Sequence, residues 1–216
     1  ELADDNTFAS ILLRVRTERG VQWVTGADHN APVMYLPPAL AGGDALVLVS
    51  GAPRERVPAL DLDAHGRTLT VRLALAADGS GRAVVEERLR GYAATGAREV
   101  IRRLDVANRE RQFEAYVGGL VAGASLEALA ITGGDDREQD MVFRYTFTAP
   151  DMARATEGGL AFEGLFHAEA ARVYAEVRER TVPLWNGDPI RAVLDLTVTL
   201  PPGATVPALP PALEGR

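Results

Sequence analysis

The residues of this 216-residue chain that could act in catalysis are few and scattered. The chain contains no cysteine, which excludes a thiol nucleophile. Its serines at positions 10, 50, 80 and 125 all lack the G-x-S-x-G turn that exposes the nucleophile of many hydrolases. Paired carboxylates could serve a glycosidase, but the acidic residues mostly fall in polar loops or on expected helix surfaces. The pattern predicts no catalytic constellation.

Metal binding is also poorly supported by the spacing of possible ligands. The segment DLDAHG at 61–66 begins like a calcium loop of the EF-hand type. The twelfth position of such a loop needs a bidentate Glu, and here it is Arg72. The neighbours Asp28 and His29 have no third ligand at a helical or hairpin spacing. We therefore predict no metal site and no cofactor.

Composition indicates a globular protein that binds neither nucleic acid nor membrane. Hydrophobic residues make up 47% of the chain, enough to bury a sizeable core. The formal charge is −7, and no basic run is long enough for binding to nucleic acid or anionic lipid. The N-terminal ELADDNTF lacks the features of a signal peptide. No stretch offers the roughly 20 apolar residues of a membrane-spanning helix.

The elements that must position any site begin with a hairpin. ILLRV and VQWV flank the polar turn RTERG and lead into a Pro-rich loop. ALVLV at 45–49 predicts a buried strand, and SGAPRERVP at 50–58 predicts a linker. A second hairpin is expected from 67–76 and 82–91, because both segments alternate in polarity around the turn ADGSG. We place a domain boundary in the linker, between residues 1–50 and 51–216.

A helical period follows the second hairpin. One apolar stripe contains Ala97, Val100, Ile101 and Leu104, and another contains Phe113, Tyr116, Val117 and Leu120. These stripes predict two amphipathic helices within residues 92–122. Strands are expected again at 125–132 and 141–149, a helix at 166–177, and a last strand ending in LPPG at 200–203. The fold predicted is α+β: mainly an antiparallel β-sandwich with two inserted helices, preceded by a hairpin and a Pro-rich loop.

Residues 8–49 resemble the closing segment of the core of bacterial transglutaminase-like proteins, which are papain-like cysteine hydrolases. In that family a phrase similar to F-N-H-V-L-L-R-V carries the catalytic His, and W-L-D-x-T-D-x-x-A-P-x-G-Y-L-P-P carries the Asp. Matched without gaps, Ser10 stands at the His position and Thr25 at the Asp position. The positions that match the family are Phe8, Leu12, Leu13, Arg14, Val15, Trp23, Asp28, Ala31, Pro32, Tyr35, Leu36, Pro37 and Pro38.

The resemblance implies that the catalytic residues have been lost. Neither hydroxyl titrates near neutral pH, so Ser10 and Thr25 cannot act as a general base or orient an imidazolium. It also implies that residues 1–50 are the degenerate end of a core and that residues 51–216 are its accessory β domain. The phrase R-x-x-P-L, matched by Arg180, Pro183 and Leu184, and the later LPPG resemble landmarks of such domains. A periplasmic or cell-envelope setting is implied as well.

Four residues are candidates for binding: Trp23, Asp28, Tyr35 and Trp185. Trp23 matches an aromatic position of the family core, where packing is the expected role. Trp185 lies in the turn PLWNGDP, where it could cap one end of a sandwich or, if exposed, anchor a partner or stack on a sugar.

The function expected is that of a non-catalytic accessory domain that positions a substrate or partner. The partner would be another protein or an upstream core domain of the same polypeptide. The alternatives are a carbohydrate- or peptide-binding module, an enzyme of another class and a plain assembly domain. The first needs a row of exposed aromatic residues, and the second a pocket with convergent titratable groups.

Overall fold

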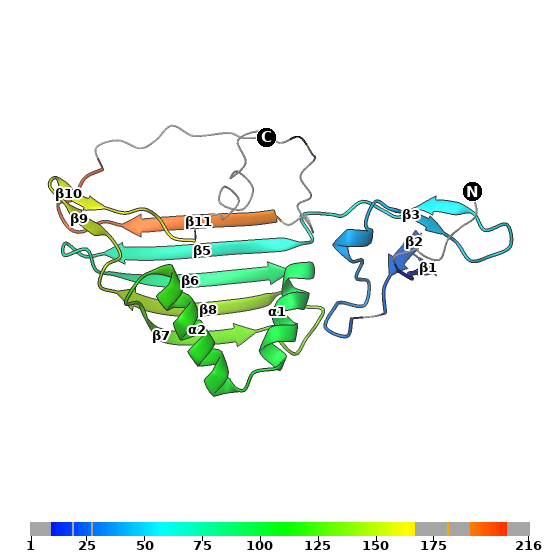
Figure 1. Cartoon of the computed structure of the whole chain (residues 1–216), viewed down its shortest axis with the longest axis horizontal. Coiled ribbons are helices and arrows are strands. Elements are labelled where there is room, and N and C mark those ends of the chain that lie inside the picture. The colour runs from blue at the N-terminus through cyan, green and yellow to red at the C-terminus, as the bar shows by residue number, and fades with distance from the viewer. Residues whose placement is uncertain (1–9, 19, 27, 167–180, 182–190, 207–216) are drawn as a thin grey trace.

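The computed structural model describes residues 10–18, 20–26, 28–166, 181 and 191–206. Its centre is a sheet of five strands with two helices against one face (Figure 1). The strands of this sheet are β5 (Gly66–Leu75), β6 (Gly81–Arg90), β7 (Ser125–Thr132), β8 (Met141–Ala149) and β11 (Arg191–Thr199). The helices, α1 (Tyr92–Arg102) and α2 (Val106–Leu120), come between β6 and β7 in the chain.

The central sheet is mixed. Its order is β11-β5-β6-β8-β7, in which β5, β6, β8 and β7 pair antiparallel and β11 pairs parallel with β5. The predicted α+β class, with two helices inserted among strands, is confirmed. The predicted sandwich of two sheets is not seen in the described residues, where the helices cover the apolar face of the central sheet.

Three smaller sheets of two strands each complete the described strands. They pair β1 (Leu13–Thr17) with β2 (Gly20–Val24), β3 (Asp44–Leu46) with β4 (Arg54–Arg56), and β9 (Arg154–Thr156) with β10 (Gly159–Ala161). A short 3-10 helix, Pro38–Leu40, lies in the Pro-rich loop between β2 and β3.

The hairpin of β5 and β6 forms as its alternating pattern predicts. Val71 pairs with Val85, and Leu73 with Ala83, so small and large apolar residues share the face under the helices. The turn is held by the Asp78 carboxylate, which accepts hydrogen bonds from the backbone N–H and the hydroxyl of Ser80 at 2.9 and 2.7 Å. The strands predicted at 125–132 and 141–149 are likewise confirmed as β7 and β8.

The two helices are confirmed, but the buried stripe of α1 differs from the prediction. α2 begins where the Asp105 side chain accepts a hydrogen bond from the backbone N–H of Asn108 at 2.8 Å. On α1, Val100 was expected to be buried and is 51% exposed, whereas Arg98 is only 2% exposed. A charged side chain takes a core position because backbone carbonyls outside the helix accept its N–H groups.

The N-terminal hairpin of β1 and β2 is confirmed, whereas residues 45–58 depart from their prediction. The expected buried strand at 45–49 is strand β3 only as far as Leu46, and Leu48 is 87% exposed. The expected linker at 50–58 contains strand β4, which folds back onto β3. The reason is that β3 has a single neighbouring strand in the described part of the chain, so its apolar side chains are not enclosed.

The C-terminal predictions are described only in part. The last predicted strand is confirmed as β11. The helix predicted at 166–177 lies outside the described residues except for Phe166, and so do Arg180, Pro183 and Leu184. None of the helices in the described ranges is long and apolar enough to span a membrane.

Candidate interaction site

Arg98 of α1 joins three segments that are far apart in the chain. Its Nε donates a hydrogen bond to the Gly133 carbonyl at 3.0 Å, and Nη1 donates to the Asn30 carbonyl at 3.4 Å. Its Nη2 donates to the carbonyl of Gln139. Burial lowers the pKa of the Arg98 guanidinium, while nearby carboxylates of the β7–β8 loop act in the opposite direction. The Arg98 junction therefore ties two parts of the chain to one helix. One is the β7–β8 loop, and the other is the described part of the chain before β3, which we call the N-terminal segment.

Asn30, which is 3% exposed, extends this junction. Its side-chain amide donates to the Glu99 carboxylate, and its side-chain oxygen accepts from Arg102 Nη1 at 3.0 Å. Its backbone N–H donates to the Asp28 carboxylate at 2.8 Å. Asp28, predicted as a binding residue, thus closes a local turn that presents Asn30 to α1.

A hollow of about 490 Å³ opens beside the junction. Its charged lining consists of Arg98, Arg102, Arg137, Asp135, Asp136 and Glu138. Glu138 also accepts a hydrogen bond from the backbone N–H of Val33 at 2.8 Å, a second tie between the β7–β8 loop and the N-terminal segment. Three cations and three carboxylates balance each other, so this hollow has no net preference for either sign of ligand. The described residues contain no group of three or more potential metal ligands.

The positions that match the family's catalytic His and Asp lie at the same end of the N-terminal hairpin. Leu13 pairs with Val24, so Ser10 and Thr25 both lie beyond the open end of β1 and β2. Ser10 is exposed, and the Thr25 backbone N–H donates to the Tyr35 carbonyl at 3.2 Å. These two positions hold hydroxyl groups, in place of the imidazole and the carboxylate that the resemblance would align with them.

The aromatic binding candidates that the structure describes are buried. Trp23 is 8% exposed and Tyr35 is 6% exposed. The Tyr35 ring meets the His65 ring edge-on at 6.3 Å between centroids, and His65 Nδ1 accepts from the backbone N–H of Tyr92 at 3.1 Å. Burial lowers the pKa of His65, and the Asp61 charge opposes this. Tyr35 and His65 thus form a second contact between the N-terminal segment and α1. Trp185 lies outside the described residues.

The N-terminal hairpin exposes an apolar row. Ile11, Leu13 and Val15 are 84%, 57% and 39% exposed, and the alternation of β1 places Leu13 and Val15 on one face. The opposite face is engaged, because Arg14 pairs with Glu55 of β4 at 2.8 Å. We call Ile11, Leu13 and Val15 the apolar row. Contiguous exposed apolar side chains of this kind mark interaction sites.

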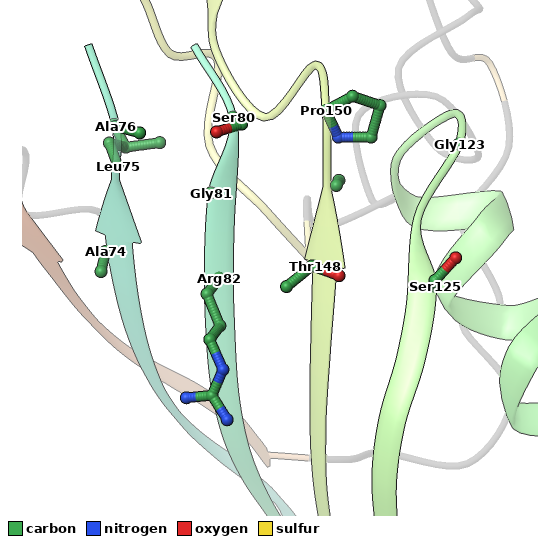
Figure 2. A pocket seen from close by; sticks show the side chains of 11 residues that line it. Ala74, Leu75, Ala76, Ser80, Gly81, Arg82, Gly123, Ser125, Thr148 and Pro150 are labelled. Atoms are coloured by element: carbon green, nitrogen blue, oxygen red, sulfur yellow. The ribbon is translucent and has the colours of Figure 1, made fainter. Parts of the chain in front are cut away.

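A second hollow, of about 560 Å³, lies at the end of the central sheet (Figure 2). Arg82, Thr148 and Ser125 come from three neighbouring strands and line it. Arg82 is the one charged residue of the lining, and its Nε is paired with Glu127 at 2.8 Å. The hollow therefore brings together no acid and base.

A carbohydrate-binding module would need aromatic residues on the face of the sheet that the helices leave uncovered. In β5, β6 and β8 the odd-numbered residues face the core and the even-numbered residues face the uncovered side. The uncovered side carries Thr, Arg and Glu residues, such as Thr70, Glu86 and Arg144. Glu86 is paired there with Arg144 at 2.8 Å and with Arg88 at 3.2 Å. A stacking platform is absent from this part of the chain.

A polar cluster lies between α2 and the sheet, with Arg67 and Tyr116 partly exposed and Glu87 buried. Arg67 Nε contacts Glu87 at 2.6 Å, and Arg67 Nη2 donates to the Tyr116 hydroxyl at 3.1 Å. Tyr145 lies beside them and is 2% exposed. Burial raises the pKa of Tyr145 far above its ordinary value, and the nearby Tyr116 adds to this. Among the described residues no group meets the Tyr145 hydroxyl with good hydrogen-bond geometry, although the Tyr116 side chain lies close to it.

We expect Tyr145→Phe to be neutral or stabilising by up to about 1 kcal/mol at pH 7, because it removes an unpaired buried hydroxyl. The unfolded chain ionises Tyr145 near its ordinary pKa of 10.0, whereas the folded chain keeps it neutral to higher pH. Ionisation of Tyr145 therefore leaves the stability unchanged below that pH and lowers it as the pH rises further, because the unfolded chain then binds fewer protons than the folded chain. Denaturant unfolding between pH 7 and 11 should show a steeper alkaline loss in the wild type. A loss of more than 1 kcal/mol at pH 7 would show that the hydroxyl is hydrogen-bonded.

The loop at residues 61–66, which begins like a calcium loop, makes contacts within the chain. Asp61 accepts from the backbone N–H of Asp63 at 2.9 Å, and the Asp63 carboxylate pairs with Arg191.

Arg98 and Asn30 were missed by sequence reasoning. The available signal was a charged residue in the row of Ala94, Arg98 and Ile101, which has the spacing of one helix face.

Comparison of the chain with protein-family models, with curated proteins and with solved structures finds no match.

Proposed function

We propose that this chain is a non-catalytic interaction domain of a transglutaminase-like protein, working in the periplasm or cell envelope. Its apolar row binds the core domain of such a protein. The observation that carries the proposal is the exposure of Ile11, Leu13 and Val15 on a hairpin whose other face is fixed to β4. The resemblance of residues 8–38 to the closing segment of the family core supports the choice of partner.

Energetics favour a partner over this row. A hairpin of two strands is marginally stable in water unless its apolar face is covered. Fully covering a large aliphatic side chain contributes about 1.5 to 3 kcal/mol, so covering these three residues favours association. The Arg98 junction and the contact of Tyr35 with His65 already hold the N-terminal segment against α1. The N-terminal segment therefore loses little conformational entropy when the row associates with a partner.

The proposed role is non-catalytic because the family positions for acid and base hold Ser10 and Thr25. The purified chain is expected to show no amide hydrolysis and no amine transfer on peptide glutamine substrates. Measurable turnover that survives further purification would overturn this part of the proposal.

The docking role is tested with the double variant Leu13→Asp/Val15→Asp. We expect the wild-type chain to bind a separately produced transglutaminase-like core, and the variant to bind at least tenfold more weakly, because two carboxylates would be buried in the contact. Isothermal titration calorimetry measures the affinity, and circular dichroism checks that the variant is folded.

A matched control is Ala130→Asp/Thr132→Asp, which places two carboxylates at alternate exposed positions of β7. This control should bind as the wild type does. The docking proposal fails if the wild-type chain does not bind the core, or if the two double variants bind equally well.

A further inference from the structure

β11 is an edge strand of the central sheet among the described strands, and its residues 191–195 are exposed on both faces. Its one neighbour among the described strands is β5, and the helices lie toward the opposite edge (Figure 1). Val193 and Leu194, which point to opposite faces, are 39% and 43% exposed. An edge strand presents unpaired backbone N–H and C=O groups along one side.

In the described part of the chain, the two edges of the sheet differ in how they are protected. At β7 the pairing with β8 is interrupted by an irregularity between Leu126 and Ala128. The Glu114 carboxylate of α2 also accepts the Leu126 backbone N–H at 2.8 Å. Bulges and capping carboxylates of this kind block further strand pairing. β11 is regular over its whole length, from Arg191 opposite Gly66 to Thr199 opposite Ala74, and contains no proline.

The charges on β11 are self-complementary. Arg191, Val193 and Asp195 share the face of the sheet that the helices leave uncovered, since they pair with even-numbered residues of β5. If a second β11 runs antiparallel with Val193 opposite its own copy, each Arg191 lies opposite an Asp195. Leu194 then lies opposite Ala192 on the other face. Moving the two-fold axis by two residues, from Val193 to Asp195, would place Asp195 opposite its own copy, so charge favours the axis at Val193 over that one.

We propose that the β11 edge binds a second copy of this chain, in an antiparallel pair with its two-fold axis at Val193. The contact is isologous, and it joins two five-stranded sheets into one continuous sheet. Arg191 also pairs with Asp63, and since both side chains are more than half exposed, exchanging this partner for Asp195 costs little. Strand pairing alone buries a small area, so the dimer is weak and depends on concentration.

The test uses charge exchange and sedimentation equilibrium of the purified chain over a range of concentrations. Arg191→Asp places two carboxylates opposite each other twice in the dimer, and Asp195→Arg places two guanidinium groups opposite each other twice. We expect each variant alone to dimerise at least tenfold more weakly than the wild type, because like charges directly opposite are destabilising. An equimolar mixture of the two variants should recover the wild-type affinity, since every cross-strand pair is again of opposite sign.

Each outcome decides the proposal. Recovery on mixing supports pairing about Val193, and it cannot arise from a general loss of folding. A monomeric wild type at the highest concentration reached, or equal affinity of all samples, overturns the proposal. Weakening without recovery on mixing excludes this register and therefore also overturns it. Leu13→Asp/Val15→Asp should leave the dimer unchanged, so this proposal and the docking of the apolar row can fail separately.

Discussion

Arg98→Met is expected to lower the free energy of unfolding by about 3 to 5 kcal/mol, because it removes the charged donor of three hydrogen bonds and such bonds contribute about 1.5 to 3 kcal/mol each. The substitution keeps most of the side-chain volume but leaves the carbonyls of Asn30, Gly133 and Gln139 without their donor. Asn30 is buried, so its carbonyl costs about 1 to 3 kcal/mol when left without a donor, whereas the carbonyls of Gly133 and Gln139 lie in a more exposed loop and can be hydrated.

The matched control is Arg102→Met, on the same helix. Arg102 is exposed and donates one hydrogen bond to the Asn30 side chain, so its loss should cost about 1 to 2 kcal/mol, less than the loss of three bonds from Arg98. Urea unfolding measures both variants, and hydrogen exchange at Asn30 and Ala31 reports whether the N-terminal segment separates from α1. Equal costs for the two variants would show that the carbonyls do not depend on Arg98.

The Arg98→Met prediction is linked to the proposed docking of the apolar row, because both depend on the N-terminal segment. If Arg98→Met frees this segment, the apolar row loses its fixed position, and its binding to the proposed core should weaken even though Leu13 and Val15 are unchanged. A freed segment must be ordered again on association, which adds an entropic cost. Arg102→Met serves once more as the control, because it leaves the Arg98 junction in place.

The strands of the central sheet could be predicted because their information is local. Alternation in β5, β6 and β8 identifies the buried face, and Asp78 and Ser80 form the turn between two of them. Sequence pattern alone did not place β11 parallel to β5, since strand order depends on contacts between distant segments. The same holds for the helices, which cover the sheet where a second sheet was expected.

The Arg98 junction could not be predicted, because its partners lie 35, 41 and 68 residues away along the chain. A carbonyl is present at every residue and leaves no trace in the sequence. In the sequence, Arg98 therefore resembles any solvated arginine. The sequence pattern places Val100 on the buried face of α1, whereas in the structure Arg98 is buried there. Asn30 was missed for the same reason: its partners Glu99 and Arg102 are distant and have ordinary surface types.

Phe147→Ala is expected to lower the free energy of unfolding by about 3 to 5 kcal/mol, as is usual when a buried aromatic side chain is truncated. Phe147 is 0% exposed, stacks with Tyr145 at 6.4 Å between centroids, and lies between Ala83 and Leu126 in the sheet. Ala83 is too small to fill the space that the ring leaves, so a cavity persists and adds to the loss of buried apolar area.

The neighbouring residue provides the control for this substitution. Thr148 lies on the opposite face of β8, so Thr148→Ala should cost less than about 1 kcal/mol. Phe147→Leu, which retains more of the volume, should fall between the two. Urea unfolding of the three variants orders them, and the pattern tests the assignment of faces throughout the sheet. If Thr148→Ala costs as much as Phe147→Ala, the uncovered face of the sheet is itself packed, and a second layer lies against it.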